Sequence, residues 1–351
     1  MAAYTTIDDA GSFQNQVLYT GDSGTNAITG VGFQPDLTWI KRRNGTYDHY
    51  LFDTTRGVLQ YVNSNDTTAD TTLANSLTTW GADGFTVGSE GVVNNSGDTF
   101  VAWNWKAGTT SGITTDGSTT ITPSSYSFNQ STGISILDYT GNGTGGAKVA
   151  HGLGATPKIV VTKRSNTTGY WYVHNAVMGD NSEAYWNDDQ TFSGSTSDGI
   201  TPDSVNFALE GTSSATNGTG DTYVCYCFAE VQGYSKFGTY KGNGNADGVF
   251  VYTGFKPAFV QTKNTALAGE WFMFDNKRPG INSYSGGNYN LSTNTDYAEV
   301  TSGGNTIDLL SNGFKARTTG GYTNGSGNII VYMAFAEDPL VNSEGVPTNA
   351  R

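Results

Sequence analysis

The chain has 351 residues, of which 18 are Lys or Arg and 31 are Asp or Glu, so its formal net charge is -13 at pH 7. This charge repels phosphate backbones and anionic lipid, and the few cations are spread along the chain rather than gathered in a basic patch. We therefore expect neither nucleic acid nor a membrane surface as a partner.

Glycine is abundant and charged residues are scarce in this sequence. There are 47 Gly residues, and only 14% of all residues are charged, against roughly 25% in an average globular protein. Solubility must then rest on Ser, Thr and Asn, which is typical of all-β surface proteins. No apolar run approaches the ~18 residues of a membrane span, and no basic and apolar leader opens the chain. We expect a protein made in a cytoplasm, with no membrane insertion.

Three segments of the chain carry one sequence pattern, in the same order each time. A proline opens a strand-like run, a lysine follows six residues later, and an Asp or Asn stands twelve residues after the lysine. The last strand-like run of each segment ends in a bulky aromatic residue, eight residues after a glycine. The signature positions are Pro35, Lys41, Asp53 and Trp105, then Pro157, Lys163, Asn175 and Phe228, then Pro257, Lys263, Asp275 and Phe335. Such fixed spacing indicates a tandem array of one unit.

We place repeat 1 at residues 1–107, repeat 2 at 133–230 and repeat 3 at 231–338, each an ordinary size for a domain. The Ser-, Thr- and Gly-rich stretch 108–132 cannot build a core, which predicts a linker or a strap laid over a neighbour. Repeats 2 and 3 follow one another with almost no slack, so we expect them to sit in a fixed relation. Residues 339–351 remain as a C-terminal tail.

The fold class that we expect is all-β, with three tandem β-sandwich domains of the jelly-roll kind. Helical patterns are almost absent, whereas runs with period-two alternation are common and are bounded by turn dipeptides such as Asp83-Gly84. Many short strands with frequent turns are typical of sandwiches and jelly rolls. The final run of each repeat is apolar on both faces, which predicts a central strand that is covered on both sides.

The segment Gly141-Asn-Gly-Thr-Gly-Gly146 matches the dinucleotide-binding pattern in its letters. That site needs a helix directly after the glycines and an acidic residue about 20 positions later. Gly152 and Pro157 argue against the helix, and there is no Asp or Glu in residues 147–179. We interpret the segment as a hairpin loop and expect no cofactor.

The histidines and cysteines do not form a recognisable metal or redox site. His49, His151 and His174 lack ligand spacing, and His174 stands where the other repeats carry Phe, so a packed ring is expected there. Cys225 and Cys227 lie two apart on a predicted strand, near the distance limit for bridging, and we assign them a packing role.

Paired carboxylates could serve glycoside cleavage if the fold brought two of them together. Asp53 and Asp275 each stand three residues before an arginine, Arg56 and Arg278, while repeat 2 has Asn175 and no arginine there. We interpret these pairs as local ion pairs worth about 0–1 kcal/mol if exposed. We therefore expect no catalytic residue and a protein that is not an enzyme.

Aromatic residues beside Asn and Asp in loops are the best candidates for contact with a sugar or a protein partner. Tyr170-Trp-Tyr172 is one such cluster, but Trp171 matches Trp271 by position, which favours a core role for it. The second cluster gives the candidate contact residues, with Trp186 expected to be exposed: Tyr185, Trp186, Asp188 and Asp189.

The sequence resembles a domain family of tailed bacteriophages that recurs in tail-fibre and other virion proteins, many of them from marine and cyanobacterial phages and from prophages. The resemblance covers nearly the whole chain. The motifs that carry it are Tyr139-Thr-Gly-Asn-Gly, Val149-Ala-His-Gly-Leu-Gly-Ala-Thr-Pro157, Tyr223-Val-Cys-Tyr-Cys-Phe-Ala-Glu230, Gly233-Tyr-Ser-Lys-Phe-Gly-Thr-Tyr-Lys-Gly-Asn-Gly244 and Ala334-Phe-Ala-Glu-Asp-Pro339. The opening Ala3-Tyr-Thr-Thr-Ile-Asp-Asp9 and Gly32-Phe-Gln-Pro-Asp36 are similar to the N-terminal copy in such proteins.

This resemblance implies a structural virion component, assembled in the host cytoplasm, with no catalytic residues to carry over. The leading hypothesis is a tail-fibre or appendage protein that contributes to host attachment. Its expected partners are other virion proteins, further copies of itself, with a trimer favoured, and a host-surface glycan. The alternatives are a capsid decoration protein and a tail protein that binds or depolymerises polysaccharide.

Overall fold

The computed structural model describes residues 4–179, 182–194, 198–279, 282, 289–301 and 305–348. Within these ranges the protein consists of β-strands with four short helical turns, η1 (Ala10–Ser12), α1 (Gly91–Asn94), η2 (Ala176–Met178) and α2 (Gly321–Asn324). The expected all-β class is confirmed. Over the same described residues, none of the helices has the length and apolar character that crossing a bilayer requires.

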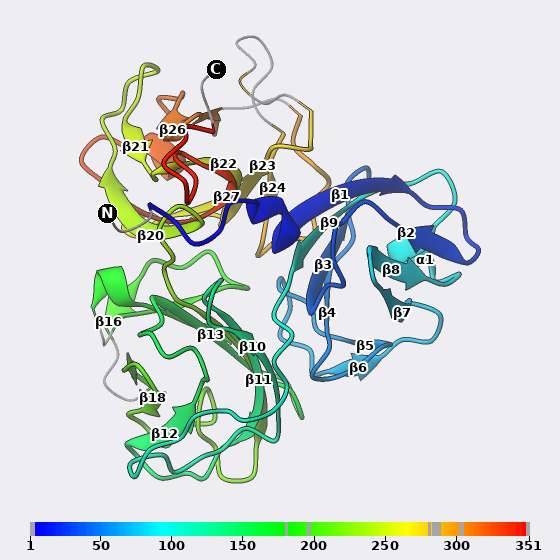
Figure 1. The fold of residues 1–351 in the computed structure, drawn as a ribbon, viewed down its shortest axis with the longest axis vertical. Helices are drawn as coiled ribbons and strands as arrows, with labels where there is room; N and C mark the ends of the chain where they lie inside the picture. Colours follow the sequence, from blue (N-terminus) through cyan, green and yellow to red (C-terminus); the bar gives the residue numbers. More distant parts are fainter. Residues whose placement is uncertain are drawn as a thin grey trace.

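Repeat 1 contains a main sheet with strand order β1-β9-β3-β4 and a small sheet with order β2-β8-β7, besides the β5-β6 pair (Figure 1). Its strands are β1 (Gln14–Thr20), β2 (Asn26–Ile28), β3 (Leu37–Arg42), β4 (His49–Asp53), β5 (Gln60–Tyr61), β6 (Thr71–Thr72), β7 (Leu77–Gly81), β8 (Gly84–Val87) and β9 (Thr99–Trp105).

Repeat 2 has the same arrangement with extra strands at both edges. Its main sheet runs β10-β11-β19-β13-β14-β15-β16 and its small sheet β12-β18-β17. The strands are β10 (Ser125–Asn129), β11 (Ile134–Thr140), β12 (Ala147–Ala150), β13 (Ile159–Arg164), β14 (Trp171–Asn175), β15 (Ser182–Tyr185), β16 (Ser193–Gly194), β17 (Ile200–Pro202), β18 (Asn206–Leu209) and β19 (Thr222–Phe228).

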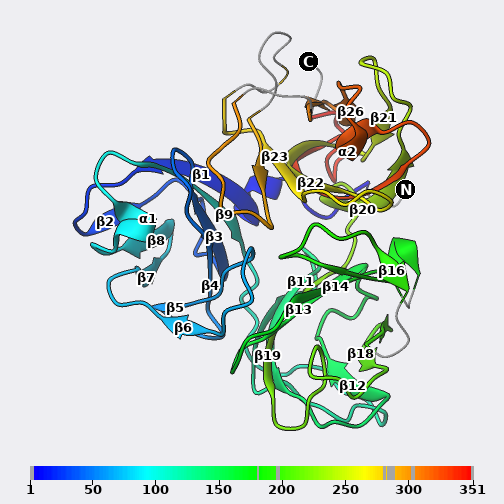
Figure 2. The ribbon, with the colours of Figure 1, turned by 180° about the vertical axis from the view of Figure 1, so that it is seen from behind.

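Repeat 3 completes the series with a main sheet β20-β27-β22-β23-β24 and a small sheet β21-β26-β25. Its strands are β20 (Ser235–Lys241), β21 (Phe250–Tyr252), β22 (Phe255–Asn264), β23 (Phe272–Asp275), β24 (Leu291–Ser292), β25 (Ile307–Leu310), β26 (Gly313–Ala316) and β27 (Ile329–Pro339). Corresponding strands thus occupy corresponding places in all three repeats, which Figure 2 shows from the opposite side.

The stretch 108–132 agrees with the strap of the two expected forms, because Ile121 pairs with Val149 of β12 in repeat 2. It also contributes a strand that was not expected, β10, which pairs with β11 and buries Phe128, because residues 125–129 alternate in character. The glycine loop from 141 to 146 joins β11 to β12 in a different sheet, so its interpretation as a hairpin loop is wrong.

The inner faces of the three main sheets meet in one common core. The final strand of each repeat contributes alternate residues to it: Val101, Trp103 and Trp105 from β9, Val224, Tyr226 and Phe228 from β19, and Val331, Met333 and Phe335 from β27. The Phe335 ring lies 5.8 Å from that of Trp105 and 5.9 Å from that of Phe228, between ring centroids. Side chains of all three repeats therefore touch at Phe335.

The opposite faces of the same strands pack on the small sheets. In repeat 1 Phe100 and Ala102 of β9 lie in a cluster with residues of β2 and β8, and in repeat 2 Cys225 and Cys227 of β19 lie in a cluster with residues of β12 and β18. These final strands are also interior in their sheets. The prediction of a central strand covered on both sides is confirmed.

A buried lysine crosses each of the three junctions between repeats. The signature lysine of each repeat places its Nζ against a backbone carbonyl in a loop of another repeat. The contacts are Lys41 with Asp296 at 3.2 Å, Lys163 with Thr67 at 2.8 Å and Lys263 with Asp189 at 2.7 Å. Repeat 1 thus binds a loop of repeat 3, repeat 2 a loop of repeat 1, and repeat 3 a loop of repeat 2. The three repeats close into a ring (Figure 1).

Backbone hydrogen bonds repeat at the same three junctions. The carbonyl that receives each lysine also accepts the N–H of the residue six positions after that lysine. These bonds are Tyr47 to Asp296 at 2.8 Å, Gly169 to Thr67 at 2.9 Å and Gly269 to Asp189 at 2.7 Å. Because the bonds involve the main chain, the junction geometry tolerates different side chains in the three loops.

An indole or imidazole ring occupies one further position at every junction. Trp171 Nε1 donates to Asn63 O at 2.6 Å, and Trp271 Nε1 donates to Tyr185 O at 3.0 Å. His49 occupies the same place in repeat 1, eight residues after the lysine. Burial first, and then the charge of Lys41, hold the pKa of His49 well below its ordinary value, so the ring is neutral. His49 is therefore the counterpart of the two tryptophans, although its residue type conceals the equivalence.

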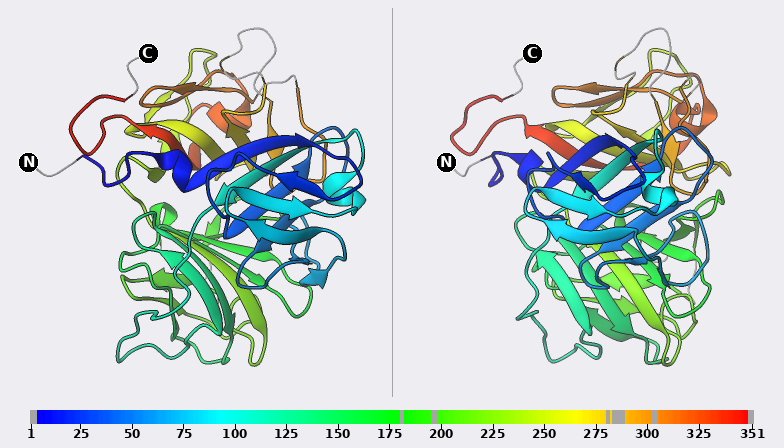
Figure 3. Two further views of the ribbon diagram at one scale, coloured as in Figure 1. Left: turned by 45° about the vertical axis from the view of Figure 1, so that its right-hand side comes forward. Right: turned by 90° about the vertical axis from the view of Figure 1, so that its right-hand side faces the viewer.

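The N-terminal segment adds to the closure of the ring by packing on repeat 3 (Figure 3). The Tyr4 hydroxyl donates to Gly254 O at 2.7 Å, and the Asp8 carboxylate accepts the Ser343 N–H at 2.6 Å. The Phe13 ring meets Tyr234 edge-on at 6.5 Å. Repeat 3 thus holds the two ends of the described chain on one side of the molecule.

We expect Lys163→Met to lower the free energy of unfolding by about 1–3 kcal/mol, because it leaves the half-buried carbonyls of Thr67 and Gly169 without their ammonium partner. Urea denaturation followed by tryptophan fluorescence measures the change. The matched control is Lys277→Met, which replaces an exposed lysine and should stay within about 0.5 kcal/mol of the wild type. Equal effects of the two substitutions would contradict the structural role assigned to Lys163.

Candidate functional site

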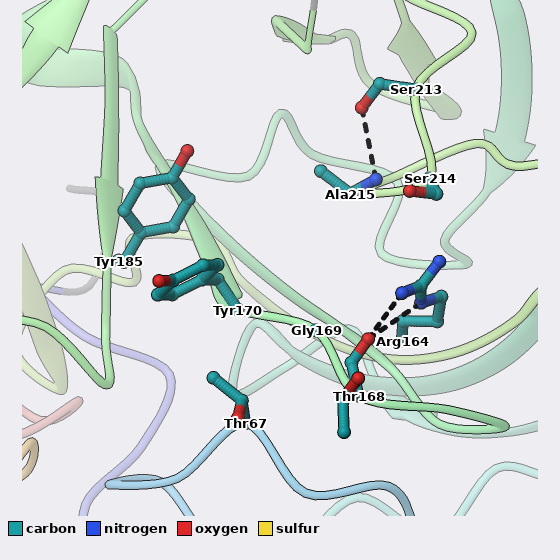
Figure 4. A pocket seen from close by; sticks show the side chains of 9 residues that line it. All are labelled: Thr67, Arg164, Thr168, Gly169, Tyr170, Tyr185, Ser213, Ser214 and Ala215. Carbon is teal, nitrogen blue, oxygen red and sulfur yellow. Dashed lines mark hydrogen bonds between the residues drawn. The ribbon is translucent and has the colours of Figure 1, made fainter.

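A cleft of about 400 Å³ opens where repeat 2 meets a loop of repeat 1 (Figure 4). Its lining combines two aromatic rings, several hydroxyl groups and one guanidinium group. The lining residues are Thr67, Arg164, Thr168, Gly169, Tyr170, Tyr185, Ser213, Ser214 and Ala215. All but Thr67 belong to repeat 2, and the cleft is therefore a feature of that repeat completed by its neighbour.

Two tyrosines form the aromatic wall of the cleft. Tyr170 directly precedes β14 and Tyr185 ends β15, and the antiparallel pairing of these strands brings the two residues side by side. Their ring centroids are 4.9 Å apart with planes tilted by 42°. Tyr170 is 51% exposed, although most aromatic rings of the chain lie in the core. The pair thus offers an apolar face to solvent.

The opposite wall is a turn, residues 213–215, which a buried asparagine holds in place. Asn217 Nδ2 donates to Thr144 O at 2.8 Å and to Gly211 O at 3.1 Å, and its Oδ1 accepts the Asn142 N–H at 3.0 Å. The Ser213 hydroxyl accepts the Ala215 N–H at 3.1 Å. The Asn217 N–H also donates to Ser213 O at 2.8 Å, so this asparagine ties the turn to the loop between β11 and β12.

Asn217 is not among the residues predicted above, although the repeat spacing contains a signal for it. Asn217 stands three residues before the repeat glycine Gly220, and Asn94 and Asn324 stand at the same distance from theirs. All three asparagines are fully buried and bind the glycine-rich loop of their repeat. An amide has donors and acceptors on one planar group, which suits a side chain that must pair with several backbone groups at once.

The floor of the cleft contains Arg164, but its charge is already paired. Its Nη1 lies 3.3 Å from Asp221 Oδ2, and its Nε donates to Thr168 O at 3.2 Å. Figure 4 shows the guanidinium group turned to the Thr168 carbonyl. The arginine therefore gives the cleft planar N–H groups with little net positive charge.

The surroundings of the aromatic wall are acidic. Burial, and after it the carboxylates of Glu183 and Asp198, raise the pKa of Tyr185 to about 12. Asp188 acts in the same direction. The chain as a whole also carries a charge of -13, so long-range electrostatics disfavour the approach of anions.

The structure separates the four candidate contact residues. Tyr185 lines the cleft, whereas the expected exposure of Trp186 is wrong, because its side chain is only 3% exposed. Successive residues at the end of a strand point to opposite faces, so a Tyr185 at the surface sends Trp186 inward. There Trp186 Nε1 donates to Gln261 Oε1 at 3.1 Å, and its ring lies 5.0 Å from that of Trp39.

Asp189 takes part in the junction with repeat 3, whereas Asp188 makes local contacts beside it. The Asp188 carboxylate accepts the Gln190 N–H at 3.2 Å and closes a local turn. Asp189 contributes its carbonyl, which receives Lys263 and Gly269, while the residue itself is exposed. The core role favoured for Trp171 is confirmed by its complete burial.

The two expected ion pairs are local, between residues three apart, but they are buried rather than exposed, and each carboxylate also accepts a hydrogen bond from another repeat. Asp53 Oδ2 lies 2.6 Å from Arg56 Nη2 and accepts the Tyr226 hydroxyl of repeat 2 at 2.9 Å. Burial alone would raise the pKa of Asp53, but Arg56 holds it below its ordinary value. Because Asp53 is completely buried and its carboxylate is bound to these partners, it acts as a structural group rather than an exposed ion pair.

Repeat 3 has the same kind of buried aspartate–arginine pair, whereas repeat 2 has other residues at these positions. Asp275 Oδ2 lies 2.6 Å from Arg278 Nε and accepts Trp103 Nε1 of repeat 1 at 3.0 Å. In repeat 2 the corresponding residues are Asn175 and Met178, and Met178 packs against the common core instead.

The histidines and cysteines are packed as expected. His151 and His174 are fully buried, as are Cys225 and Cys227, whose Sγ atoms lie 3.7 Å apart as free thiols. Across the residues that the structure describes, no three His, Cys, Asp or Glu side chains are placed to hold a metal ion together.

The architecture defines the class of protein: an all-β chain whose three repeats close into a ring, with an open cleft in repeat 2. The sequence matches the model of DUF7483, a domain of unknown function, over residues 9–339, and the chain belongs to this family. A comparison with curated proteins finds no match.

Asp138 gives the stability of the ring a specific dependence on pH. Burial first, and then the negative charge of Asp53, raise the pKa of Asp138 to about 7, whereas in an unfolded chain it is about 4. Between these values the folded protein holds a proton that the unfolded chain has lost, so the free energy of unfolding falls as pH rises. Arg56 partly opposes the shift, and Asp70 adds to it.

We expect Asp138→Asn to gain stability relative to the wild type as pH rises from about 4 to about 7, and to keep a constant advantage above that range. Urea denaturation of both proteins across this range gives the difference. Asp247→Asn is the control, because a hydrogen bond from Lys315 lowers the pKa of Asp247 below its ordinary value, so its difference should change only at more acidic pH and stay nearly flat across this range. A difference for Asp138→Asn that does not change with pH would contradict the assignment.

Proposed function

We propose that the chain is a structural, non-catalytic component of a tailed-phage virion, and specifically a tail-fibre or appendage protein that contributes to host attachment. The observation that carries the proposal is the closed ring itself. The buried charged groups described above, Lys41, Lys163, Lys263, Asp53 and Asp275, hold repeats together, and no carboxylate is among the described residues that line the open cleft. The resemblance to phage virion domains supports the same function.

The ring also suits a protein that must keep its shape outside a cell. Its three repeats share one aromatic core, so that unfolding of one repeat would expose the inner faces of the other two. The surface is left to short polar loops, which are the parts of a β-scaffold that can vary and bind without loss of the fold. Both features favour a particle component that presents loops to a target.

The proposed partners are other virion proteins and further copies of this chain, with a trimer favoured. The lysine junctions are already occupied within one chain, because each loop that receives a lysine is bound by a repeat of the same molecule. A trimer of this protein must therefore form through other surfaces. Its proposed location is the virion, after assembly in the host cytoplasm.

Immunogold labelling of purified phage particles with an antibody against this chain tests the proposal. Label at the tail is the expected result. Label distributed over the head would favour the runner-up, a capsid decoration protein. Absence of the chain from particles, checked by mass spectrometry of the same preparation, would overturn a virion function altogether.

A depolymerising tail protein is the second alternative, and it makes a different chemical prediction. Incubation of the purified protein with host capsule or lipopolysaccharide should leave the polymer length unchanged, as measured by size-exclusion chromatography. Release of short oligosaccharides would refute the non-catalytic proposal. Since Asp53 is buried in a junction, such activity would have to come from other carboxylates.

A further inference from the structure

The three repeats provide an internal comparison that explains why the cleft exists. The position six residues after the signature lysine is Tyr47 in repeat 1, where the Arg42 guanidinium lies 4.1 Å above the Tyr47 ring centroid. In repeat 2 this position is Gly169, which leaves room beside Arg164. In repeat 1 an aromatic ring thus occupies the space that is open in repeat 2.

Repeat 3 fills the equivalent space from the other wall. Tyr322 stands two residues before the buried Asn324, and its ring lies so close to Gly269 that a methyl group added to this glycine would collide with it. In repeat 2 the residue two positions before Asn217 is Ala215, and the glycine is Gly169. Only repeat 2 combines a small residue at both positions, and its cleft follows from that combination.

We propose that this cleft of repeat 2 binds a neutral hexose unit of a surface glycan. The proposal rests on the proposed attachment function for its biological setting, and it names the class of ligand that this function would use. The site includes Tyr185 of the expected contact residues but not Trp186, which is in the core.

The chemistry of the lining fits a sugar ring. A hexose has one face of C–H groups and a rim of hydroxyls, so it packs its apolar face on an aromatic ring and pairs its rim with polar groups. Tyr170 and Tyr185 supply the rings, and Thr168, Ser213 and Ser214 supply hydroxyls on the walls around them. A volume of about 400 Å³ is within the range of small-molecule sites.

Electrostatics select a neutral ligand. Arg164 is paired with Asp221, and the carboxylates of Glu183 and Asp198 act on the Tyr185 hydroxyl. A uronic acid or a sialic acid would bring a negative charge into this environment without an unpaired cation among the lining residues to receive it, and like charges repel. Neutral hexoses avoid this cost.

The test is binding of the purified full-length protein to a glycan array that carries neutral and acidic bacterial polysaccharides, followed by calorimetry with the best neutral oligosaccharide. Ala215→Tyr reproduces in repeat 2 the residue that fills the space in repeat 3, and Tyr170→Ala removes the exposed ring. We expect binding to neutral glycans and at least a tenfold loss of affinity in each variant. Tyr297→Ala is the matched control, because Tyr297 is a 63% exposed tyrosine outside the cleft, and it should bind as the wild type does.

Melting temperatures of all variants should stay near that of the wild type, which separates loss of the site from loss of the fold. Binding to acidic glycans alone, absence of binding to any neutral glycan, or binding that survives both cleft variants would each overturn the proposal. None of these results bears on where the chain lies in the particle, so a failed glycan site and a failed virion assignment are distinguished by the array and the gold labelling.

Discussion

The structure depends on the burial of three lysine ammonium groups at the junctions between repeats. Moving a charge out of water is costly unless hydrogen bonds replace the lost hydration. In repeat 2 the ammonium group of Lys163 is bound by Gly169 of its own hairpin at 2.7 Å and by Thr67 of the neighbouring repeat at 2.8 Å. The hydrogen bonds of this ammonium group are therefore complete only when the neighbouring repeat is docked. Burial lowers the pKa of each of the three lysines to about 8, so they remain charged at neutral pH. The folded protein must therefore supply hydrogen bonds to all three ammonium groups.

The three junctions share a backbone pattern but differ in side chains, and the difference bears on which repeats pair. Where β19 and β9 present a donor, Tyr226 or Trp103, the facing repeat has an aspartate paired with arginine. Where β27 presents Met333, which has no hydrogen to donate, repeat 2 carries Asn175 in place of the aspartate. If a repeat with the aspartate faced Met333, its buried carboxylate would lose a hydrogen-bond donor. The free energy lost would exceed the free energy gained from the apolar contact. The shared backbone bonds thus form the ring, and these side chains distinguish the junction between repeats 2 and 3 from the other two.

The sequence predicted the features that depend on periodicity and missed those that depend on backbone partners. Strand alternation identified the two-faced final strand ending in Trp105, and equivalence to Trp271 identified Trp171 as a core residue. The lysine was recognised only as a spacing marker, because its partners across the junction are carbonyls, and every residue has one. Trp186 was misplaced because the end of β15 decides which of two adjacent aromatics faces solvent. The cleft itself arises from two small residues, and small residues give a signal only when the repeats are superimposed.

A closed ring with an open cleft suits the proposed attachment function even if each cleft binds its glycan weakly. A millimolar site corresponds to about -4.1 kcal/mol, which two stacking rings and a few hydroxyls can supply when no loop has to be ordered first. The anchoring of the 213–215 turn by Asn217 and of Tyr170 by the junction with repeat 1 provides that order before the ligand arrives.

On a particle with several copies, binding of further clefts becomes intramolecular, and the overall affinity can rise by roughly 10²–10⁴ without any new contact. Weak single sites also let a particle release and rebind until several are engaged, because the lifetime of each contact is set by its own dissociation rate. For the proposed glycan site, the negative charge of the chain would add discrimination, because it repels acidic polymers before contact and leaves neutral glycans to the fit of the cleft.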